Sequence, residues 1–407
     1  MEKKRKDREE AHLYMDVIVA TNQQFKAWEG FDIVPWTREK QTEQPDAAPK
    51  LYRILRTTTI GDFTKTIAED LNMDPALLRP WIMVNRQNQT TRPDAPLLDP
   101  NQTVEEASIK HQSKRQGLLV WMETTDQKDS EGRGDFGENH VELRGSNGTQ
   151  QDKAILLFLK YFDIETQSLR GVGQFYASLS DKVQDMSPQI LKALGWPAGA
   201  SYRAYEEIRA QMIEDMKPKQ TLQQSELQDG DIVTVQKVLS EKEIAALPVK
   251  SPILTAKEFY DHIQTRFTLA FHPKPGSPEE HGVFNLEVNR KMTYDQLSAK
   301  VAEHLGVEST HLRFWFVNVS TAKPKGPMRR NPTTNLASLI GLNGSTYMNG
   351  SSIHNQRTDC LYYEILEYSL AEMETRKNIK VTWIHDGIQK EVKRTFQLHQ
   401  DAKLTIW

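Results

Sequence analysis

The sequence predicts an α+β protein that consists of several small domains in tandem, and three observations support this fold class. The length of 407 residues corresponds to two to four domains at about 150 residues per domain. The stretch from Thr59 to Trp81 recurs without a gap from Thr293 to Trp315, and a looser copy lies between them. Each copy contains an amphipathic helical pattern flanked by strand-like runs.

The internal repeat is the strongest sign of how the chain is organised. TIGDFTKTIAEDLNMDPALLRPW and TYDQLSAKVAEHLGVESTHLRFW superimpose at an offset of 234 residues (293 − 59). The helix of the looser copy, which runs from Asp181 to Tyr205, aligns at an offset of 111 residues (293 − 182). Recurrence of this kind indicates one structural unit that is used three times.

Apolar residues in all three copies follow the spacing i, i+3, i+7, i+11. They are Ile60, Phe63, Ile67 and Leu71, then Val183, Met186, Ile190 and Leu194, then Tyr294, Leu297, Val301 and Leu305. This spacing places one apolar stripe along a helix of about three turns, which suits packing on a sheet. Thr293 with Gln296 forms a capping-box pattern, Asp181 with Gln184 forms a variant of it, and Gly306 suits a helix end.

Strand-like runs flank each helix, two before it and two after it. We expect strands at residues 13–20, 51–55, 79–84 and 118–123, at 154–162, 171–178, 201–208 and 231–237, and at 267–271, 283–288, 313–317 and 361–368. One helix that crosses a small mixed sheet is the β-grasp arrangement of ubiquitin-like domains. The fold class predicted is therefore α+β with tandem ubiquitin-like β-grasp domains.

Polar, turn-rich stretches separate these units. The predicted domains cover residues 13–123, 152–240 and 251–370. Residues 124–151, which are rich in Gly, Asp, Asn and Ser, are predicted to be a flexible linker. A hairpin pattern at residues 379–385 and 388–396 opens a fourth unit over residues 378–407. The chain ends where the repeat requires a helix, so we expect this unit to be truncated relative to a longer parent.

Composition excludes several classes of function. With 52 basic and 55 acidic residues, the formal net charge of −3 disfavours a protein held to nucleic acid by phosphate contacts. A membrane span is not expected, because no run of about 18 apolar residues occurs. One cysteine allows neither an intramolecular disulfide nor a multi-cysteine zinc site. The histidines lack metal-ligand spacing, so no metal or other cofactor is expected, and the start MEKKRKDREEAH indicates an intracellular protein.

Cys360 is the one candidate nucleophile. A catalytic interpretation needs a base and an orienting group, for which His354 and Asp359 are the nearest candidates in sequence. The alternative, an ordinary thiol at the start of a strand, is favoured because buried cysteine usually behaves as a small apolar residue.

An acidic cluster, Glu226, Asp229 and Asp231 in the string ELQDGD, surrounds a predicted tight turn. Three close carboxylates repel one another unless they are solvated or paired with a partner's Lys or Arg. They could equally belong to a polar turn that uses Asp-Gly for its backbone geometry. Spacing alone favours the turn.

Several strings resemble the C-terminal ubiquitin-like region of the herpesvirus-associated ubiquitin-specific proteases. They are EAHLYMDV, AILLFLKYFDIETQSLRGVGQFY, SELQDGDIVTVQK, LTAKEFYDHIQTRFTLAF and KVTWIHDGIQKEV. The resemblance covers essentially the whole chain in order. It implies that five ubiquitin-like domains follow a papain-like catalytic domain, that residues 1–12 end a connecting helix, and that three domains and part of a fourth are present.

The resemblance also has implications for activity and binding. The family's catalytic Cys and His boxes lie upstream and match nothing here, so no catalytic residue and no peptidase activity are expected of this chain alone. The family's second ubiquitin-like domain binds Lys/Arg-containing segments of substrates and of a ubiquitin ligase through an acidic turn, which Glu226, Asp229 and Asp231 match. Ser225 stands where the family often has another acid. This implication reverses the preference for a plain turn.

The sequence therefore predicts a non-catalytic, substrate-recruiting and regulatory region of a cysteine deubiquitinase, in the nucleus and cytoplasm. Its expected partners are Lys/Arg-rich segments of substrates and ubiquitin ligases, and the catalytic domain of the parent protease. The alternatives are a freestanding ubiquitin-like adaptor with no peptidase, and an enzyme that uses Cys360.

Overall fold

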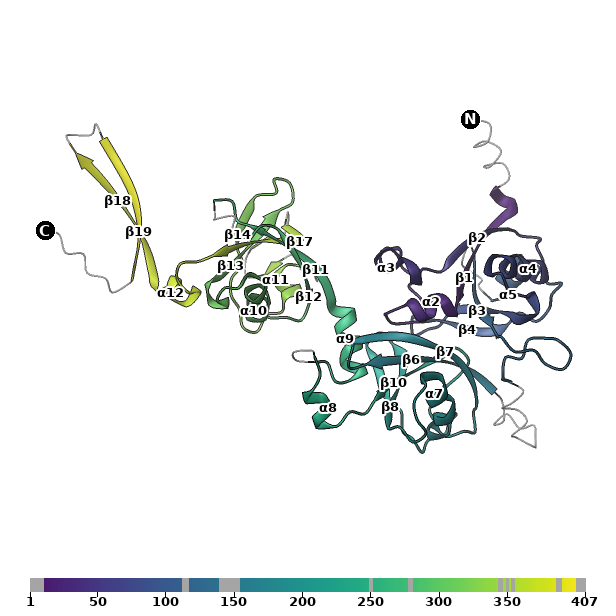
Figure 1. The fold of residues 1–407 in the computed structure, drawn as a ribbon. Helices are drawn as coiled ribbons and strands as arrows, with labels where there is room; N and C mark the ends of the chain where they lie inside the picture. Colours follow the sequence, from purple (N-terminus) through teal and green to yellow (C-terminus); the bar gives the residue numbers. More distant parts are fainter. Residues whose placement is uncertain are drawn as a thin grey trace. The chain divides into compact units, whose positions relative to one another are not determined.

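The computed structural model describes residues 11–111, 117–138, 154–248, 252–276, 281–342, 347–348, 351–352, 356–385 and 390–399. The chain divides into two compact units, Met1–Gln264 and Thr265–Trp407, which are described separately below (Figure 1). The first unit contains two β-grasp domains, and the second contains a third. The α+β fold class predicted from the sequence is confirmed.

The first domain folds around a five-stranded mixed sheet of order β2-β1-β5-β3-β4, in which β1 and β5 are parallel. Its elements are η1 (Ala11–Leu13), β1 (Tyr14–Thr21), α2 (Asn22–Ala27), α3 (Arg38–Glu43), η2 (Pro45–Ala47), β2 (Lys50–Leu55), α4 (Ile60–Leu71), η3 (Pro75–Leu77), β3 (Leu78–Asn85), β4 (Thr91–Pro96), α5 (Val104–His111) and β5 (Gly117–Thr124). Thr59 caps the start of helix α4, where its hydroxyl accepts from the Asp62 amide, and Asn72, in the left-handed conformation, caps the end.

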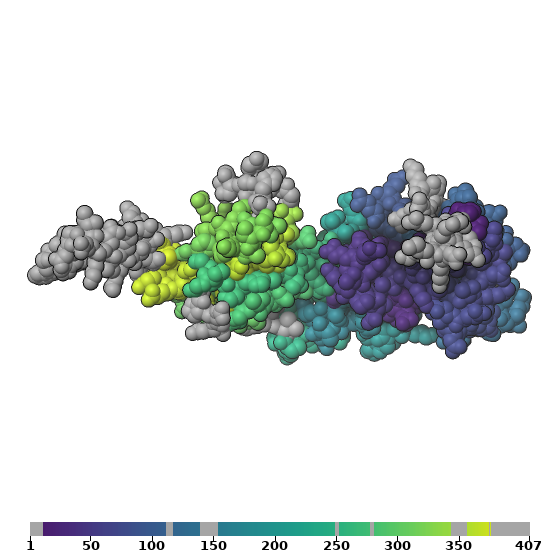
Figure 2. Space-filling model, turned by 90° about the horizontal axis from the view of Figure 1, so that it is seen from above, coloured from purple at the N-terminus to yellow at the C-terminus, as the bar shows by residue number. Residues whose placement is uncertain are grey.

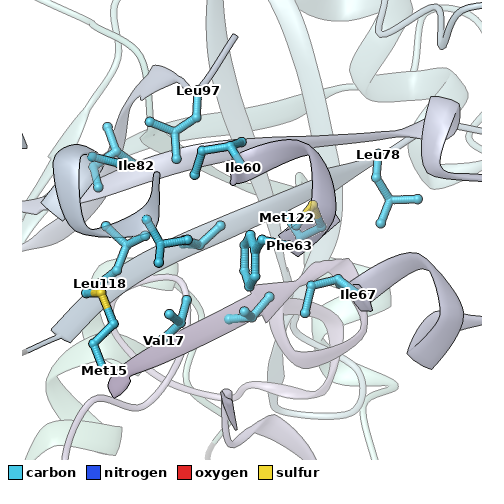
Figure 3. Close-up of a cluster of buried hydrophobic side chains, with 14 of the residues drawn as sticks. Met15, Val17, Ile60, Phe63, Ile67, Leu78, Ile82, Leu97, Leu118 and Met122 are labelled. Atoms are coloured by element: carbon cyan, nitrogen blue, oxygen red, sulfur yellow. The ribbon is translucent and has the colours of Figure 1, made fainter. Parts of the chain in front are cut away.

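The apolar stripe of α4 forms the core of this domain. Ile60, Phe63 and Ile67 are buried against Val17 of β1 and Leu118 of β5 (Figure 3). Alternate residues of β1 and β5 point into this core, as the two-residue period of a strand requires. Burial of each such side chain contributes about 1.5–3 kcal/mol, so the stripe holds the helix on the sheet.

The second domain repeats the topology with the sheet order β7-β6-β10-β8-β9. Its elements are β6 (Ala154–Asp163), β7 (Ser168–Ser178), η5 (Val183–Met186), α7 (Ser187–Leu194), β8 (Tyr202–Arg209), β9 (Met212–Asp215) and β10 (Asp231–Lys237).

The helix of the second domain differs from its prediction in two ways. It is divided into a 3₁₀ turn and α7, because Pro188 lacks the amide that a continuous helix from Val183 would need. The expected cap formed by Asp181 is wrong: the Asp181 carboxylate accepts from the Ser178 amide at 3.0 Å. Asp185 instead accepts from the amide that opens the helical segment.

Two helices follow the second domain, α8 (Glu241–Ala245) and α9 (Ala256–Thr265). Helix α9 packs on the second sheet, where the Phe259 ring stacks on Phe162 at a centroid distance of 4.7 Å. The sequence assigns these residues to a third domain beginning at residue 251. The structure places α9 in the first unit because its apolar face is buried there.

The third domain has the sheet order β12-β11-β17-β13-β14. Its elements are β11 (Arg266–Pro273), β12 (Phe284–Asn289), α10 (Tyr294–Leu305), η6 (Ser309–His311), β13 (Leu312–Asn318), β14 (Pro324–Pro327), α11 (Leu336–Leu339), β15 (Tyr347–Met348), β16 (Ser351–Ser352), β17 (Gln356–Ile365) and α12 (Leu370–Thr375). Thr293 and Gln296 form the predicted capping box, and Gly306 adopts the left-handed conformation that ends α10. A hairpin of β18 (Arg376–His385) and β19 (Lys390–His399) follows.

Each sheet contains a fifth, edge strand that the sequence does not predict: β4, β9 and β14. We call the helix of the repeat in each domain its principal helix: α4, the segment of η5 and α7, and α10. A β-bridge lies at the start of each principal helix and joins Thr59 to Thr103, Lys182 to Thr221 and Thr293 to Asn335. The three domains therefore share details beyond the repeated helix.

The first two domains pack through the sheet faces that lie opposite their principal helices. Trp121 of β5 and Phe25 of α2 make edge-to-face contacts with Phe158 of β6, at centroid distances of 4.9 and 5.3 Å. In the space-filling view, the purple and blue atoms of the first domain lie directly against the teal atoms of the second (Figure 2). An apolar interface of this kind makes the two domains one body.

A fully buried ionic cluster lies in the same interface. Lys160 Nζ donates to Glu207 Oε2 and to the main-chain carbonyl of Asp32, each at 2.7 Å. Arg92 pairs with Asp32 at 3.0 Å and with Glu207 at 3.1 Å, and the Tyr260 hydroxyl donates to Glu207. The cluster therefore joins the first domain, the second domain and α9.

The predicted linker at residues 124–151 is described as far as residue 138. Residues 125–138 lie against the first domain, where the Gly134 amide donates to the Ala76 carbonyl at 2.9 Å. The remainder, residues 139–151, lies outside the described residues. No helix in the described part of the chain is long and apolar enough to span a membrane.

Candidate functional site

The acidic turn that the sequence singles out precedes β10 and is held in place from both sides. Leu222, just before the turn, and Leu227, within it, are buried in the core of the second domain. The Gly230 amide donates to the Leu156 carbonyl at 2.7 Å, and Gly230 has a positive φ of 86°. Glycine is suited to this position because a left-handed backbone is strained for other residues.

The three predicted acids have different surroundings. Glu226 is exposed. Asp229 accepts the Leu156 amide on Oδ1 at 2.8 Å, so it ties the turn to β6. Asp231 is 8% exposed, accepts the Gln228 amide at 2.8 Å, and forms an ion pair with Arg86. The structure brings the three into one turn but leaves Glu226 the most open to a partner.

The first domain forms one wall of this site. Its β3–β4 turn carries Arg86, and Asn88 Nδ2 donates across the interface to the Ile208 carbonyl at 3.0 Å. A Cβ on Gly230 would lie 2.5 Å from the Pro93 carbonyl oxygen, so the acidic turn is in close contact with β4. The geometry of the turn thus depends on both domains.

Next to the turn is a cavity of about 470 Å³, which we call the acidic hollow. Its charged lining comprises Glu206, Glu214, Asp215, Glu226, Asp231, Arg86 and Lys217. Five acids and two bases give this lining a formal net charge of −3. Ile208, Met212 and Met216 supply apolar surface in the same cavity.

Glu206 is the most strongly perturbed acid in the acidic hollow. Burial, followed by the nearby charges of Asp231, Glu214 and Glu226, raises the pKa of Glu206 to about 7. Glu206 also lies directly opposite Glu214 in the β8–β9 register, and like charges in this position are destabilising. A cation placed among these carboxylates would relieve the repulsion.

Sequence reasoning found the acidic turn but missed Glu206, Glu214, Asp215 and Arg86. Strand β9 was not expected, because the β8–β9 connection at residues 210–211 lacks Gly, Asn or Asp. The paired acids on both sides of this connection, residues 206–207 and 214–215, could have indicated an acidic site in the sequence. Nothing in the sequence near the acidic turn indicates that Arg86, which comes from another domain, contributes to the site.

Within the described part of the chain, the surroundings of Cys360 do not favour a nucleophile. It is 3% exposed, and burial together with the Asp359 carboxylate raises the pKa of its thiol. A reactive cysteine needs a lowered pKa and access to substrate. His354, the suggested base, lies outside the described residues. Across the described ranges, no group of three or more His, Cys, Asp or Glu side chains is placed to hold a metal ion.

The fold and the acidic hollow together define a region of tandem ubiquitin-like domains with a negatively charged site. A family model described as the ICP0-binding domain of Ubiquitin-specific protease 7 matches residues 78–340, and one described as Ubiquitin-specific protease C-terminal matches residues 360–405. The chain belongs to this ubiquitin-specific protease 7 family, of which it is the non-catalytic region.

Curated relatives match almost the whole chain. Ubiquitin carboxyl-terminal hydrolase 15 of Schizosaccharomyces pombe is 28% identical over 404 residues, which cover 99% of this chain and 33% of the relative. Ubiquitin C-terminal hydrolase 12 of Arabidopsis thaliana is 28% identical over 417 residues, covering 98% and 33%. Ubiquitin carboxyl-terminal hydrolase 7 of Drosophila melanogaster is 21% identical over 394 residues, covering 95% and 31%. The chain spans about a third of the length of these relatives.

Proposed function

We propose that this region recruits protein partners to a ubiquitin-specific cysteine protease by binding their Lys/Arg-rich segments in the acidic hollow. The observation that carries the proposal is the gathering of Glu206 and four other acids in one hollow, and the raised pKa of Glu206 is consistent with it. The family model is named for a domain that binds a protein, ICP0, which supports partner binding in this part of the chain.

The lining of the acidic hollow suits a lysine or arginine side chain. Glu206, Glu214 and Glu226 offer carboxylates to the charged head, and charge-assisted hydrogen bonds to carboxylates are about twice as strong as neutral ones. Met212 and Met216 offer apolar surface to the methylene stem, which long basic side chains bury while the head stays polar. Asp229 has a positioning role through the Leu156 amide.

The test is a titration of the full chain with a dibasic probe, a capped Gly/Ser peptide that carries two lysines. Charge reversal in Glu214→Lys with Glu226→Lys should reduce the affinity at least tenfold, because both changes put cations in the hollow. Wild-type affinity should fall as salt is added, since the attraction is electrostatic.

The matched control is Glu69→Lys, which reverses an exposed acid on α4 and should leave the affinity unchanged. Equal affinity of the wild-type and doubly reversed proteins would show that the acidic hollow is not the binding site.

We also propose that the peptidase belongs to the same polypeptide as this region. The named hydrolases that match the chain are about three times its length, which supports this arrangement. Sequencing complete transcripts tests it: an upstream reading frame with catalytic Cys and His boxes is expected. Transcripts that encode no such boxes would favour the freestanding adaptor instead.

A further inference from the structure

We propose that Arg86 of the first domain is an internal ligand of the acidic hollow. Its guanidinium occupies one of the positions that a cation can take there, and so limits how many basic residues a partner can place in the hollow. Arg86 Nη1 forms an ion pair with the Asp231 carboxylate, and Nη2 donates to the main-chain carbonyl of Asp229. Its side chain is only 15% exposed. The inference rests on the proposed function and concerns its regulation.

The β3–β4 turn delivers this guanidinium in a fixed position. The Arg86 amide donates to the Thr90 carbonyl at 2.8 Å, and Gln89 has a positive φ of 68°. Asn88 anchors the tip of the turn to the Ile208 carbonyl of the second domain. Arg86 is therefore preorganised on the acidic turn, and a partner's side chain must compete with it at a high effective concentration.

The end of the acidic hollow that is formed by β8 and β9 is arranged differently from the end at Arg86. Among the acids of the hollow, all of which are described, Asp231 forms an ion pair, and its partner is Arg86. Glu206 and Glu214 face each other across β8 and β9. Burial, followed by the charges of Asp231, Glu214 and Glu226, raises the pKa of Glu206. A partner's first basic residue is expected at this end, whereas a second one would have to displace Arg86.

Removal of the guanidinium should open the second position. Arg86→Met keeps the apolar stem but changes the formal net charge of the charged lining from −3 to −4, and it leaves Asp231 without its ion pair. The dibasic probe should then bind about tenfold more tightly. A monobasic probe, with one lysine in the same capped peptide, should gain less than about threefold, since it uses the position that is already open.

Arg86→Lys is the matched control, because it keeps a cation at this position and should not reproduce the tenfold gain. Thermal unfolding of each variant shows whether the first unit remains folded. If Arg86→Met does not fold, Asn88→Ala replaces it. That variant loosens the turn while keeping the guanidinium, and it should strengthen dibasic binding by a smaller factor.

The outcomes separate the two proposals. If neither probe binds to any variant, the proposed function fails. If wild type binds the dibasic probe and Arg86→Met binds it equally or more weakly, or if Asn88→Ala as the replacement gives no gain, the internal ligand is overturned and the proposed function stands. A gain of about tenfold for the dibasic probe in Arg86→Met, with less than about threefold for the monobasic probe, supports both, whereas equal gains for the two probes overturn the internal ligand.

Discussion

Glu206 shows how strongly one side chain can depend on its surroundings. Its pKa of about 7 lies well above the ordinary value of 4.5, because it is partly buried beside Asp231, Glu214 and Glu226. In the unfolded chain this carboxyl would ionise near its ordinary pKa. Between about pH 4.5 and pH 7 the folded protein therefore holds a proton that the unfolded chain has lost.

The stability of the protein should depend on pH through Glu206. The pKa of Glu206 is raised in the folded protein, so the protonated carboxyl contributes to stability. This contribution should be fully present below about pH 4.5 and be lost as the pH rises through about 7. Glu206→Gln cannot ionise, so it should be more stable than wild type by about 1–2 kcal/mol at pH 8 and similar at pH 4. Chemical denaturation at both pH values measures this difference. A variant less stable than wild type at pH 8 would contradict the raised pKa of Glu206.

The same substitution should weaken binding. A bound cation favours the ionised carboxylate, so the affinity of the wild-type protein for the dibasic probe should rise between pH 5 and pH 7 and then level off. Glu206→Gln should bind the probe several-fold more weakly at pH 7.5 and lose most of this pH dependence. Titration calorimetry at three pH values is the measurement, and a parallel pH profile in both proteins would exclude Glu206 from the site.

At the scale of elements, the turn before β10 depends on the absence of a side chain at Gly230. Gly230→Ala should destabilise the first unit by about 2–4 kcal/mol, because the added Cβ combines a positive φ of 86° with a 2.5 Å approach to the Pro93 carbonyl. Gly199→Ala is the control: Gly199 has the same φ of 86°, but its Cβ would meet nothing within 4 Å. Denaturation that shows equal losses for both variants would mean that contact with the first domain is unimportant.

The elements also show what could be predicted from the sequence. The three helices and most strands were predictable because their apolar residues follow regular periods. Edge strands such as β9 are short and pair on one side only, so they carry little apolar signal. The division of the second helix could have been predicted from Pro188, whereas the anchoring of α9 on Phe162 depends on tertiary contacts.

The candidate site also contains residues that could be predicted from the sequence and residues that could not. The turn with Glu226, Asp229 and Asp231 was predictable because its residues are adjacent in sequence. Arg86 could not be predicted, because it reaches Asp231 only through the packing of two domains. Whether these acids bind a partner remains a prediction.

At the scale of the molecule, the buried ionic cluster links both domains of the first unit to α9. Lys160→Met should destabilise this unit by about 3–5 kcal/mol, because it leaves the fully buried Glu207 with an incomplete set of partners. Calorimetry of the full chain should show a shift of the transition of the first unit while that of the second unit stays in place. Lys192→Met, at an exposed position on α7, should leave both transitions unchanged.

The parallel pair at the centre of each sheet has a consequence for protein synthesis. In the first domain Val17 pairs in register with Leu118, so the sheet cannot close until most of that domain has left the ribosome. The part of Trp121 that contacts Phe158 then stays uncovered until Phe158 has also emerged. At roughly 5–20 residues per second, a growing chain exposes this aromatic surface for seconds. The nascent first domain is therefore expected to need chaperone protection until its neighbour has been translated.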